Sequence, residues 1–448
     1  MSHRMVASAF WCCLLALVAA QGPRAEEAPV SVYGGRSAAI SPATGWFRTA
    51  REDGRWWLVD PAGRRFLSIG VNHVSYAADM IRGTDRSPYR EAVSQKYGPP
   101  PEWADPTIKR LKGWGFNTIG AWSDPITWRQ QMPYTVILDF ARQVKWQEGQ
   151  QFPDVFSPDF AQAARRTARR VCRPLADDPW LIGYFTDNEL HWGPDWRTSD
   201  SLFAEFLKFP DPSPGRRAVL NFLARRYLTI DQLNEDWGAQ YESFAQIGRL
   251  PQVGAHIPQD DEDGFLLLVA DRYFTLTQEA IRAADPNHLI LGCRFAGAAP
   301  KPVLEAMKDH VDVVSLNHYD VHPPRAALRD IHRLTGCPVI LTEFSYRGRD
   351  SGLPNTRGAG VVVDTQQDRA ESFARYVQEL IALPMVVGYH WFEHADEPAE
   401  GRFDGEDSNY GLVNLQDEPY PALVETMSRI NDSAYQLAAG SPRRSKGD

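Results

Sequence analysis

The sequence predicts an α/β fold: a (β/α)8 TIM barrel with an N-terminal β-hairpin or meander and a helical insertion after the fourth strand. Short apolar runs recur eight times, and helical patterns lie between several of them. The first run is followed by Asn72-His73 and lacks the glycine-rich turn of a dinucleotide-binding sheet. Because parallel neighbours need crossover connections, these observations favour a closed barrel over an open, doubly wound sheet.

Each element is placed by its hydrophobic period and its flanking turn residues. The strands are expected at 66–71, 116–121, 135–138, 181–185, 289–293, 311–316, 339–341 and 386–389. The clearest helices are expected at 158–171, 265–284, 303–310, 325–334 and 366–380.

Residues 1–20 are typical of a secretory signal peptide. Arg4 precedes an apolar run over 6–20 that ends in small residues, so we expect cleavage near Ala20 and a secreted or periplasmic protein. A retained N-terminal anchor is the alternative. No later stretch reaches the roughly 18 apolar residues of a membrane helix, so no span is expected after signal removal.

After a linker over 21–44, residues 45–438 are predicted to form a single barrel domain. Its N-terminal β segment, 45–66, alternates apolar and polar residues around turns such as Asp53-Gly54. The connection after the fourth strand is longer than a barrel loop needs and contains helical stretches, one following a Thr229 cap. We therefore predict an insertion over 193–263. Residues 439–448 are a polar tail.

Composition excludes some classes of protein. The 448 residues include 48 Lys plus Arg and 57 Asp plus Glu, a formal charge of −9, which argues against a nucleic-acid partner. The hydrophobic fraction of 43% is enough for a sizeable core. Outside the signal, Cys172, Cys293 and Cys337 are odd in number and widely spaced. They suit buried packing better than a disulfide framework or a zinc site.

Two carboxylates stand at strand ends that a barrel places opposite each other. Glu189 closes the fourth strand and Glu343 closes the seventh. Glycoside hydrolysis uses such a pair, one carboxylic acid to protonate the leaving oxygen and one carboxylate to attack the anomeric carbon or to activate water. A carboxylate at the end of an apolar strand is costly unless it is paired or used, so catalysis is preferred here over a structural salt bridge.

Other polar and aromatic side chains at strand ends are candidates for binding sugar hydroxyls and sugar faces. They are Asn72, His73, Trp122, Trp192, Arg294 and Trp391. For Trp192, packing in the core is an equally good interpretation. For Arg294, a structural salt bridge is an equally good interpretation. No metal site is expected, because the strand-end histidines lack the His-x-His or His-Glu-x-x-His spacing of metal ligands.

Residues at four strand ends resemble clan A glycoside hydrolases, which are retaining (β/α)8 enzymes. They are Asn188-Glu189, Tyr319 after Asn317-His318, Glu343 and Trp391. The stretches 343–347, 350–360 and 387–392 look more narrowly like family 50 β-agarases, and 222–238 resembles family 42 β-galactosidases.

This resemblance implies that Glu189 is the acid/base, that Glu343 is the nucleophile, that Asn188 binds the sugar 2-hydroxyl and that Tyr319 orients Glu343. It implies no cofactor. Glu189 then needs a raised pKa, while Glu343 should stay ionised with help from the Tyr319 hydroxyl. The two carboxyl groups of a retaining enzyme should lie about 5 to 5.5 Å apart.

The leading hypothesis is a secreted retaining β-glycosidase that cleaves β-galactosidic linkages in agarose-like or other galactan poly- or oligosaccharides. A β-glycosidase acting on a non-galactan glycan and a non-catalytic glycan-binding barrel are the alternatives. A metal-dependent barrel hydrolase is a further alternative, which loss of activity on chelation would support.

Overall fold

The computed structural model describes residues 30–146, 150–249 and 256–440. Its centre is a sheet in which neighbouring strands run parallel. In chain order the strands are β4 (Ser68–Val71), β5 (Thr118–Ile119), β6 (Tyr134–Ile137), β7 (Leu181–Phe185), β8 (Leu289–Ile290), β9 (Phe295–Ala296), β10 (Val314–Asn317), β11 (Val339–Glu343) and β14 (Val386–Trp391). Every residue of β7 and β11 is buried, as expected of strands covered on both faces.

One segment, 289–296, closes this sheet into a barrel. Its first part, β8, pairs with β7, and its second part, β9, pairs with β10. Between them the Arg294 N–H donates to the Asp187 carbonyl at 3.0 Å, and just beyond them the Gly297 N–H donates to the Asn317 carbonyl at 2.8 Å. The segment is thus the fifth of eight barrel strands, and the predicted (β/α)8 fold is confirmed.

A small antiparallel sheet covers the end of the barrel that lies opposite the strands' carboxyl ends. It contains β1 (Arg48–Glu52), β2 (Arg55–Val59) and β3 (Arg65–Phe66), as the 45–66 pattern predicted. Phe47, Leu58 and Phe66 pack against barrel residues such as Ile182 and Val387. The hairpin therefore closes the lower end of the barrel, beneath the core.

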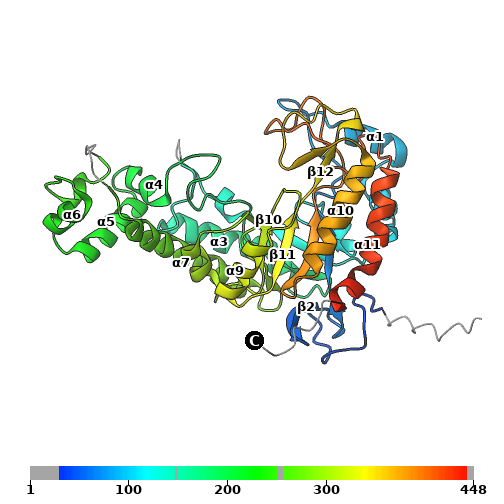
Figure 1. The fold of residues 1–448 in the computed structure, drawn as a ribbon, viewed down its shortest axis with the longest axis horizontal. Coiled ribbons are helices and arrows are strands. Elements are labelled where there is room, and N and C mark those ends of the chain that lie inside the picture. Colours follow the sequence, from blue (N-terminus) through cyan, green and yellow to red (C-terminus); the bar gives the residue numbers. More distant parts are fainter. Residues whose placement is uncertain (1–29, 147–149, 250–255, 441–448) are drawn as a thin grey trace, which may run out of the picture.

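Helices surround the barrel (Figure 1). They are α1 (Pro88–Tyr97), α2 (Pro100–Gly113), α3 (Pro158–Val171), α7 (Gln259–Ala284), α8 (Lys301–Met307), α9 (Arg325–Thr335), α10 (Gln366–Ile381) and α11 (Pro421–Ala439). The bounds of α3 are those predicted, because the Ser157 hydroxyl caps its first turn and Pro158 follows. The α7 helix begins six residues before the predicted 265, in a turn of acidic residues that favours a helix N-terminus.

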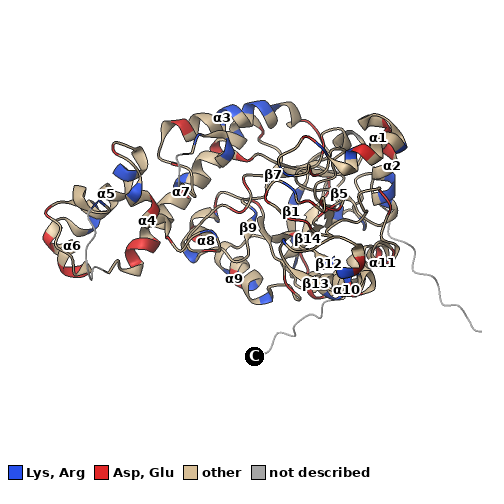
Figure 2. Cartoon of the chain, turned by 90° about the horizontal axis from the view of Figure 1, so that it is seen from above, with Lys and Arg blue, Asp and Glu red and all other residues tan. Residues whose placement is uncertain are grey.

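The chain after β7 leaves the barrel and forms a helical projection (Figure 1). It contains α4 (Leu202–Lys208), α5 (Pro214–Tyr227) and α6 (Ile230–Trp237), and α7 leads back. The predicted Thr229 cap accepts a hydrogen bond from the Gln232 N–H. Aromatic rings of Phe203, Phe206 and Phe265 pack inside it. Lys, Arg, Asp and Glu are spread together over the outer helices (Figure 2).

Two short parallel strands, β12 (Tyr346–Gly348) and β13 (Val361–Val363), lie on the loop that follows β11. Cys172, Cys293 and Cys337 are all free, and the first two are buried as expected. Among the described residues no helix is long and apolar enough to span a membrane. The predicted signal 1–20 and the tail from 441 lie outside the described residues.

A buried carboxylate fastens the loop before α11 to the first two helices. Asp417 accepts hydrogen bonds from Tyr89 at 2.9 Å, Tyr97 at 2.7 Å and Arg110 at 3.1 Å, and its side chain is not exposed. Burial alone would raise the pKa of Asp417, but these donors outweigh it and lower the pKa to about 2. The folded state therefore stabilises the charged form.

We expect Asp417→Asn to lower the free energy of unfolding by about 3 kcal/mol at pH 7, because the partly buried Arg110 loses its counter-charge. The contribution of Asp417 is present above the ordinary carboxyl pKa near 4 and is lost as the pH falls towards 2. Urea unfolding at pH 7 and pH 3 measures both effects. Glu418→Gln is the control, since that exposed side chain pairs with Lys96 alone and should change stability by less than about 0.5 kcal/mol. Equal effects of the two variants would contradict the assignment.

Candidate active site

The two predicted carboxylates lie at the carboxyl ends of β7 and β11. Glu343 is the last residue of β11, and its side chain is almost fully buried. Glu189 follows β7 and is held by its own N–H, which donates to the Arg294 carbonyl at 2.8 Å. This bond extends the pairing of the fourth and fifth strands past their regular ends. Both carboxylates therefore belong to the rigid rim of the barrel.

A continuous polar network connects these two carboxylates. Nη1 of Arg294 lies 2.9 Å from Oε1 of Glu343 and also donates to Oδ1 of Asn188 at 2.9 Å. Nδ2 of Asn317 donates to the same Asn188 oxygen at 3.2 Å and to Oε1 of Glu189 at 2.9 Å. Asn317 and Arg294 thus bridge the fourth and seventh strands. The structure therefore brings Glu189, Glu343, Asn188 and Arg294 together at the mouth of the barrel.

The surroundings of Glu343 act on its pKa in opposite directions. Burial raises the pKa of Glu343 to about 7, and the nearby Glu189 carboxylate adds to this rise. Arg294 and the Tyr319 hydroxyl, which donates to Oε2 at 2.7 Å, oppose the shift without cancelling it. The Tyr319 contact is the one the sequence indicated. Loss of solvation is the larger effect because this carboxyl is only 5% exposed.

The backbone is strained where several strands reach the mouth. His73, Trp122, Asp139 and Glu189 have φ angles of 53°, 58°, 49° and 47°. These residues follow β4, β5, β6 and β7 respectively. A left-handed conformation is unfavourable for residues with a side chain and is concentrated at functional sites. Here it turns the chain sharply at the rim of the barrel.

Aromatic rings line part of the site, although they are not all those expected. Trp122 lies under the Arg294 guanidinium at 4.3 Å and contacts Phe392 edge to face. Phe392 also contacts Tyr319, the residue bonded to Glu343. Phe392 and Trp122 therefore lie beside Tyr319 and Arg294, the two residues that contact Glu343.

Two of the predicted sugar-binding tryptophans lie in the core instead. Trp192 is 5% exposed and packs on Phe274 and Tyr273. Trp391 is fully buried against Phe344, and its indole N–H donates to a backbone carbonyl at 2.9 Å. Trp391 belongs to β14, where successive side chains face opposite sides of the strand, and its ring packs against Phe344 and Phe373. Packing is the role that the structure gives them.

Asn72 also has a structural position. It is fully buried, and its amide nitrogen donates to the carbonyls of Thr342 at 2.8 Å and Trp391 at 3.3 Å. Its oxygen accepts from the Ala121 N–H at 3.0 Å. The amide nitrogen of Asn72 thus connects its own strand to the seventh and eighth strands. The structure therefore gives Asn72 a structural role in place of the expected contact with sugar hydroxyls.

His73 belongs to a group of charged residues beside the site. Its Nδ1 contacts Glu393 and lies 3.7 Å from Asp79, and ligand atoms of the three lie within 4.8 Å of one another. Burial would lower the pKa of His73, but the two carboxylates outweigh it and raise the pKa to about 9. A metal ligand must be unprotonated, so this geometry fits an ion pair better than a metal site. Arg402 completes the cluster through Glu397 at 3.0 Å.

Several residues of the site were not identified from the sequence. Asn317 enters the sequence prediction only as a neighbour of Tyr319 in the stretch that resembles clan A enzymes, and neither Glu393 nor Arg402 is among the predicted residues. Phe392 is likewise absent from the predicted sugar-binding residues. The signal for Phe392 and Glu393 was their position directly after the eighth strand, which is where barrel enzymes place site residues.

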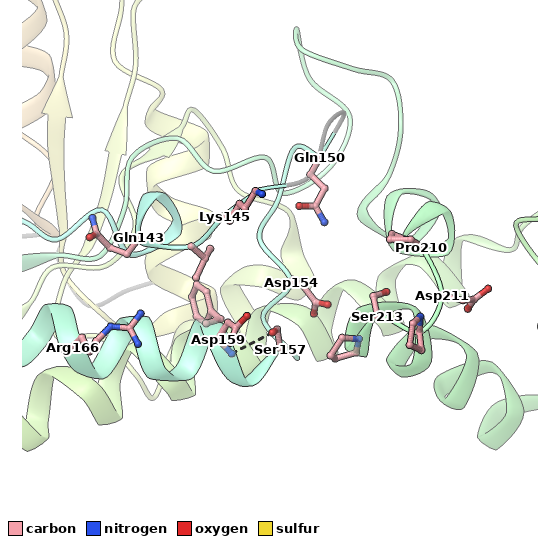
Figure 3. Close-up of a pocket in the computed structure, with 14 residues that line it drawn as sticks. Gln143, Lys145, Gln150, Asp154, Ser157, Asp159, Arg166, Pro210, Asp211 and Ser213 are labelled. Atoms are coloured by element: carbon pink, nitrogen blue, oxygen red, sulfur yellow. Dashed lines mark hydrogen bonds between the residues drawn. The ribbon is translucent and has the colours of Figure 1, made fainter.

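A separate hollow of about 510 Å³ lies away from the carboxylates, between the start of α3 and the start of α5 (Figure 3). Polar side chains such as Asp154, Asp159 and Asp211 line it. None of the site residues above contributes to its wall. The two carboxylates and their network therefore lie outside this hollow.

Comparison with known proteins agrees with the barrel. A family model described as beta-galactosidase, that of glycoside hydrolase family 42, matches residues 102–336. The fold and this match define the class of protein as a barrel glycoside hydrolase. Since the match covers just over half of the sequence, the chain belongs to this family.

The chain is also similar to agarases over most of its length. Beta-agarase B of Vibrio sp. strain JT0107 is 27% identical over 91% of this chain and 50% of the relative. Beta-agarase A of the same strain is 31% identical over 86% of this chain and 45% of the relative. The chain therefore spans about half the length of these two relatives.

Solved structures of agarases are also similar to this chain. The agarase AgWH50C superimposes with a TM-score of 0.81 at 28% identity, over 91% of this chain and 68% of that chain. An exo-beta-agarase gives a TM-score of 0.81 at 26% identity, over 92% and 68%. The resemblances to family 50 β-agarases and to family 42 β-galactosidases are both confirmed.

We expect Tyr319→Phe to raise the pKa of Glu343 above its value of about 7, because the carboxylate loses a hydrogen-bond donor to its charged form. Carboxyl ¹³C chemical shifts of labelled glutamate, followed against pH, measure the titration, and Glu343→Gln assigns the resonance. Tyr410→Phe is the matched control, since that hydroxyl donates to the Ala359 carbonyl. An unchanged titration in Tyr319→Phe would show that the hydroxyl does not stabilise the carboxylate.

Proposed function

We propose that this chain is a secreted, retaining β-glycosidase that hydrolyses β-galactosidic linkages in agarose-like galactans. The observation that carries the proposal is the position of Glu343, which Arg294 and Tyr319 hold. It is connected to Glu189 by a network that runs through Arg294, Asn188 and Asn317. Similarity to proteins named as agarases supports the class of glycan. The signal-like residues 1–20 support export.

In the first step Glu343 attacks the anomeric carbon and forms a glycosyl ester, while the glycosidic C–O bond breaks. Glu189 gives its proton to the leaving oxygen at the same time. In the second step Glu189 takes a proton from water, the water oxygen attacks the anomeric carbon, and Glu343 leaves as a carboxylate. Retention requires that the two carboxyl groups lie about 5 to 5.5 Å apart.

The neighbouring residues position the sugar in this proposal. Oδ1 of Asn188 accepts from both Arg294 and Asn317, which fixes the amide and leaves its NH2 group for the sugar 2-hydroxyl. The rings of Trp122 and Phe392 lie beside this position and offer apolar faces to the C–H groups of a pyranose.

A β-glycosidase for another glycan is the second candidate. The barrel and the carboxylate pair suit any β-glycoside, and only the likeness to agarases favours galactans. A reducing-sugar screen on agarose, porphyran, carrageenan, galactan and β-mannan separates these candidates. Hydrolysis of β-mannan alone would reject the galactan assignment while the two-carboxylate mechanism remained.

Replacing either carboxylate should abolish turnover of the natural glycan, with a loss of at least about 10³-fold in kcat for Glu343→Ala, because no glycosyl ester forms. Azide separates the two roles on a β-glycoside with an activated leaving group. Glu189→Ala should form a β-glycosyl azide, because azide replaces the water of the second step. Glu343→Ala should form an α-glycosyl azide, because azide attacks the anomeric carbon directly. NMR of the products gives the configuration.

Asp187→Asn is unsuitable as a control, because Asp187 is buried and bonded to Tyr273. Glu305→Gln is suitable, since this exposed α8 side chain pairs with Lys301 and with no other cation in the described part of the chain. It should retain full activity. Wild-type rates in Glu343→Ala, or azide products of the opposite configurations, would exclude the assigned roles.

A further inference from the structure

Two arginines at the rim of the barrel mouth approach the same small gap. Arg82 lies on the loop after β4, and Arg357 lies on the loop between β12 and β13. A methyl group placed on Gly405 would lie 3.0 Å from Nη1 of Arg357 and 3.3 Å from Nη1 of Arg82. Glycine, with a φ of 92°, leaves this gap between the two guanidinium groups open.

Neither guanidinium is neutralised by a carboxylate. Among the described residues no Asp or Glu oxygen lies within 4.0 Å of Arg82 or Arg357, and both residues are exposed. The acidic residues nearby are already engaged: Arg402 pairs with Asp404 at 3.1 Å and with Glu406 at 2.7 Å. Two like charges converging without a counter-ion repel each other, and an oxyanion placed between them removes that repulsion.

The loops that carry these arginines are firmly held. The N–H of Arg357 donates to Asp407 at 2.8 Å, and the N–H of Arg82 donates to the Gly401 carbonyl at 2.9 Å. A turn connects the Arg402 carbonyl to the Gly405 N–H at 2.8 Å. The backbone therefore fixes where both side chains begin, so that less conformational entropy is lost when a ligand binds.

The loop that carries Arg357 also contacts Tyr319, the residue bonded to Glu343. Gly360 packs on Tyr319, because a methyl group there would lie 3.1 Å from Cβ of Tyr319, and Tyr319 bonds Glu343. Arg357 is three residues before Gly360, a span of at most about 11 Å. Between them the Ala359 carbonyl accepts from the Tyr410 hydroxyl at 2.9 Å.

An apolar surface stands next to the same gap. Phe403 is 69% exposed at the tip of the turn that contains Gly405, and Met80 is 43% exposed two residues before Arg82. An exposed aromatic ring suits the apolar face of a sugar, and adjacent guanidinium groups suit an anionic group on that sugar. Neutral galactans need only the first of these features.

We infer that Arg82 and Arg357 form a subsite for an anionic substituent, a sulfate ester or a carboxylate, on a sugar near the cleaved bond. The sulfate ester of a sulfated galactan is the favoured ligand, because its oxygens accept hydrogen bonds from both guanidinium groups. The inference rests on the proposed galactan-cleaving function, and it names the substrate more narrowly than similarity to agarases does.

Binding without turnover tests this subsite. Glu343→Gln is the background for all measurements, and titration calorimetry compares a sulfated porphyran oligosaccharide, its chemically desulfated counterpart and a pyruvylated agarose oligosaccharide. We expect the sulfated form to bind at least tenfold more tightly than the desulfated form at low salt, with an advantage that shrinks as salt is added. Tighter binding of the pyruvylated form alone would assign the subsite to a carboxylate.

The double variant Arg82→Ala/Arg357→Ala should lose this advantage and bind the desulfated form unchanged. Arg51→Ala is the matched control, because Arg51 is an exposed arginine on β1 at the opposite end of the barrel, and it should keep the advantage. Equal affinity for charged and neutral forms, or an advantage that survives in the double variant, would overturn the inference. Because binding is measured without hydrolysis, the two proposals can fail separately. An inactive wild-type protein would reject the proposed function, and the binding data would still test the anion subsite.

Discussion

The mouth of the barrel depends on one buried cation, Arg294. A fully buried guanidinium loses the hydration it had in water, and only charged or polar partners at close range compensate. Arg294 has such partners on two strands: Glu343 with the Thr342 carbonyl on the seventh, and Asn188 on the fourth. Removal of this cation would leave Glu343 without a counter-charge at a site with almost no solvent.

The same burial acts against the charged form of Glu343. Its counter-charge and its hydrogen bond from Tyr319 favour ionisation, yet the loss of water raises its pKa to about 7. In a glycosidase the positive charge develops on the sugar, beside the nucleophile, in the transition state. A carboxylate that is only partly stabilised at rest gains more from that charge than a well-solvated one would, which is the differential stabilisation that catalysis needs.

The strands and the carboxylate pair were predictable because they depend on local pattern and on chain order. Apolar runs with helices between them define a parallel barrel, and Glu189 and Glu343 directly follow or end such runs. Side-chain direction was less predictable. Trp391 and Phe392 are adjacent, and only the pleat decides which one faces the mouth. Asn72 failed as a sugar-binding residue because its partners come from strands distant in the sequence.

Charge is distributed at the mouth in a way that the net value of −9 conceals. Carboxylates beside the site are gathered around His73 and Arg402, where opposite charges compensate them. The cations at the outer rim, Arg82 and Arg357, have no such partners among the described residues. An acidic protein repels an anionic polymer over most of its surface, so a local positive rim would orient such a chain towards the site and away from the rest. The screening length of about 8 Å at physiological salt confines this effect to the sugars nearest the mouth.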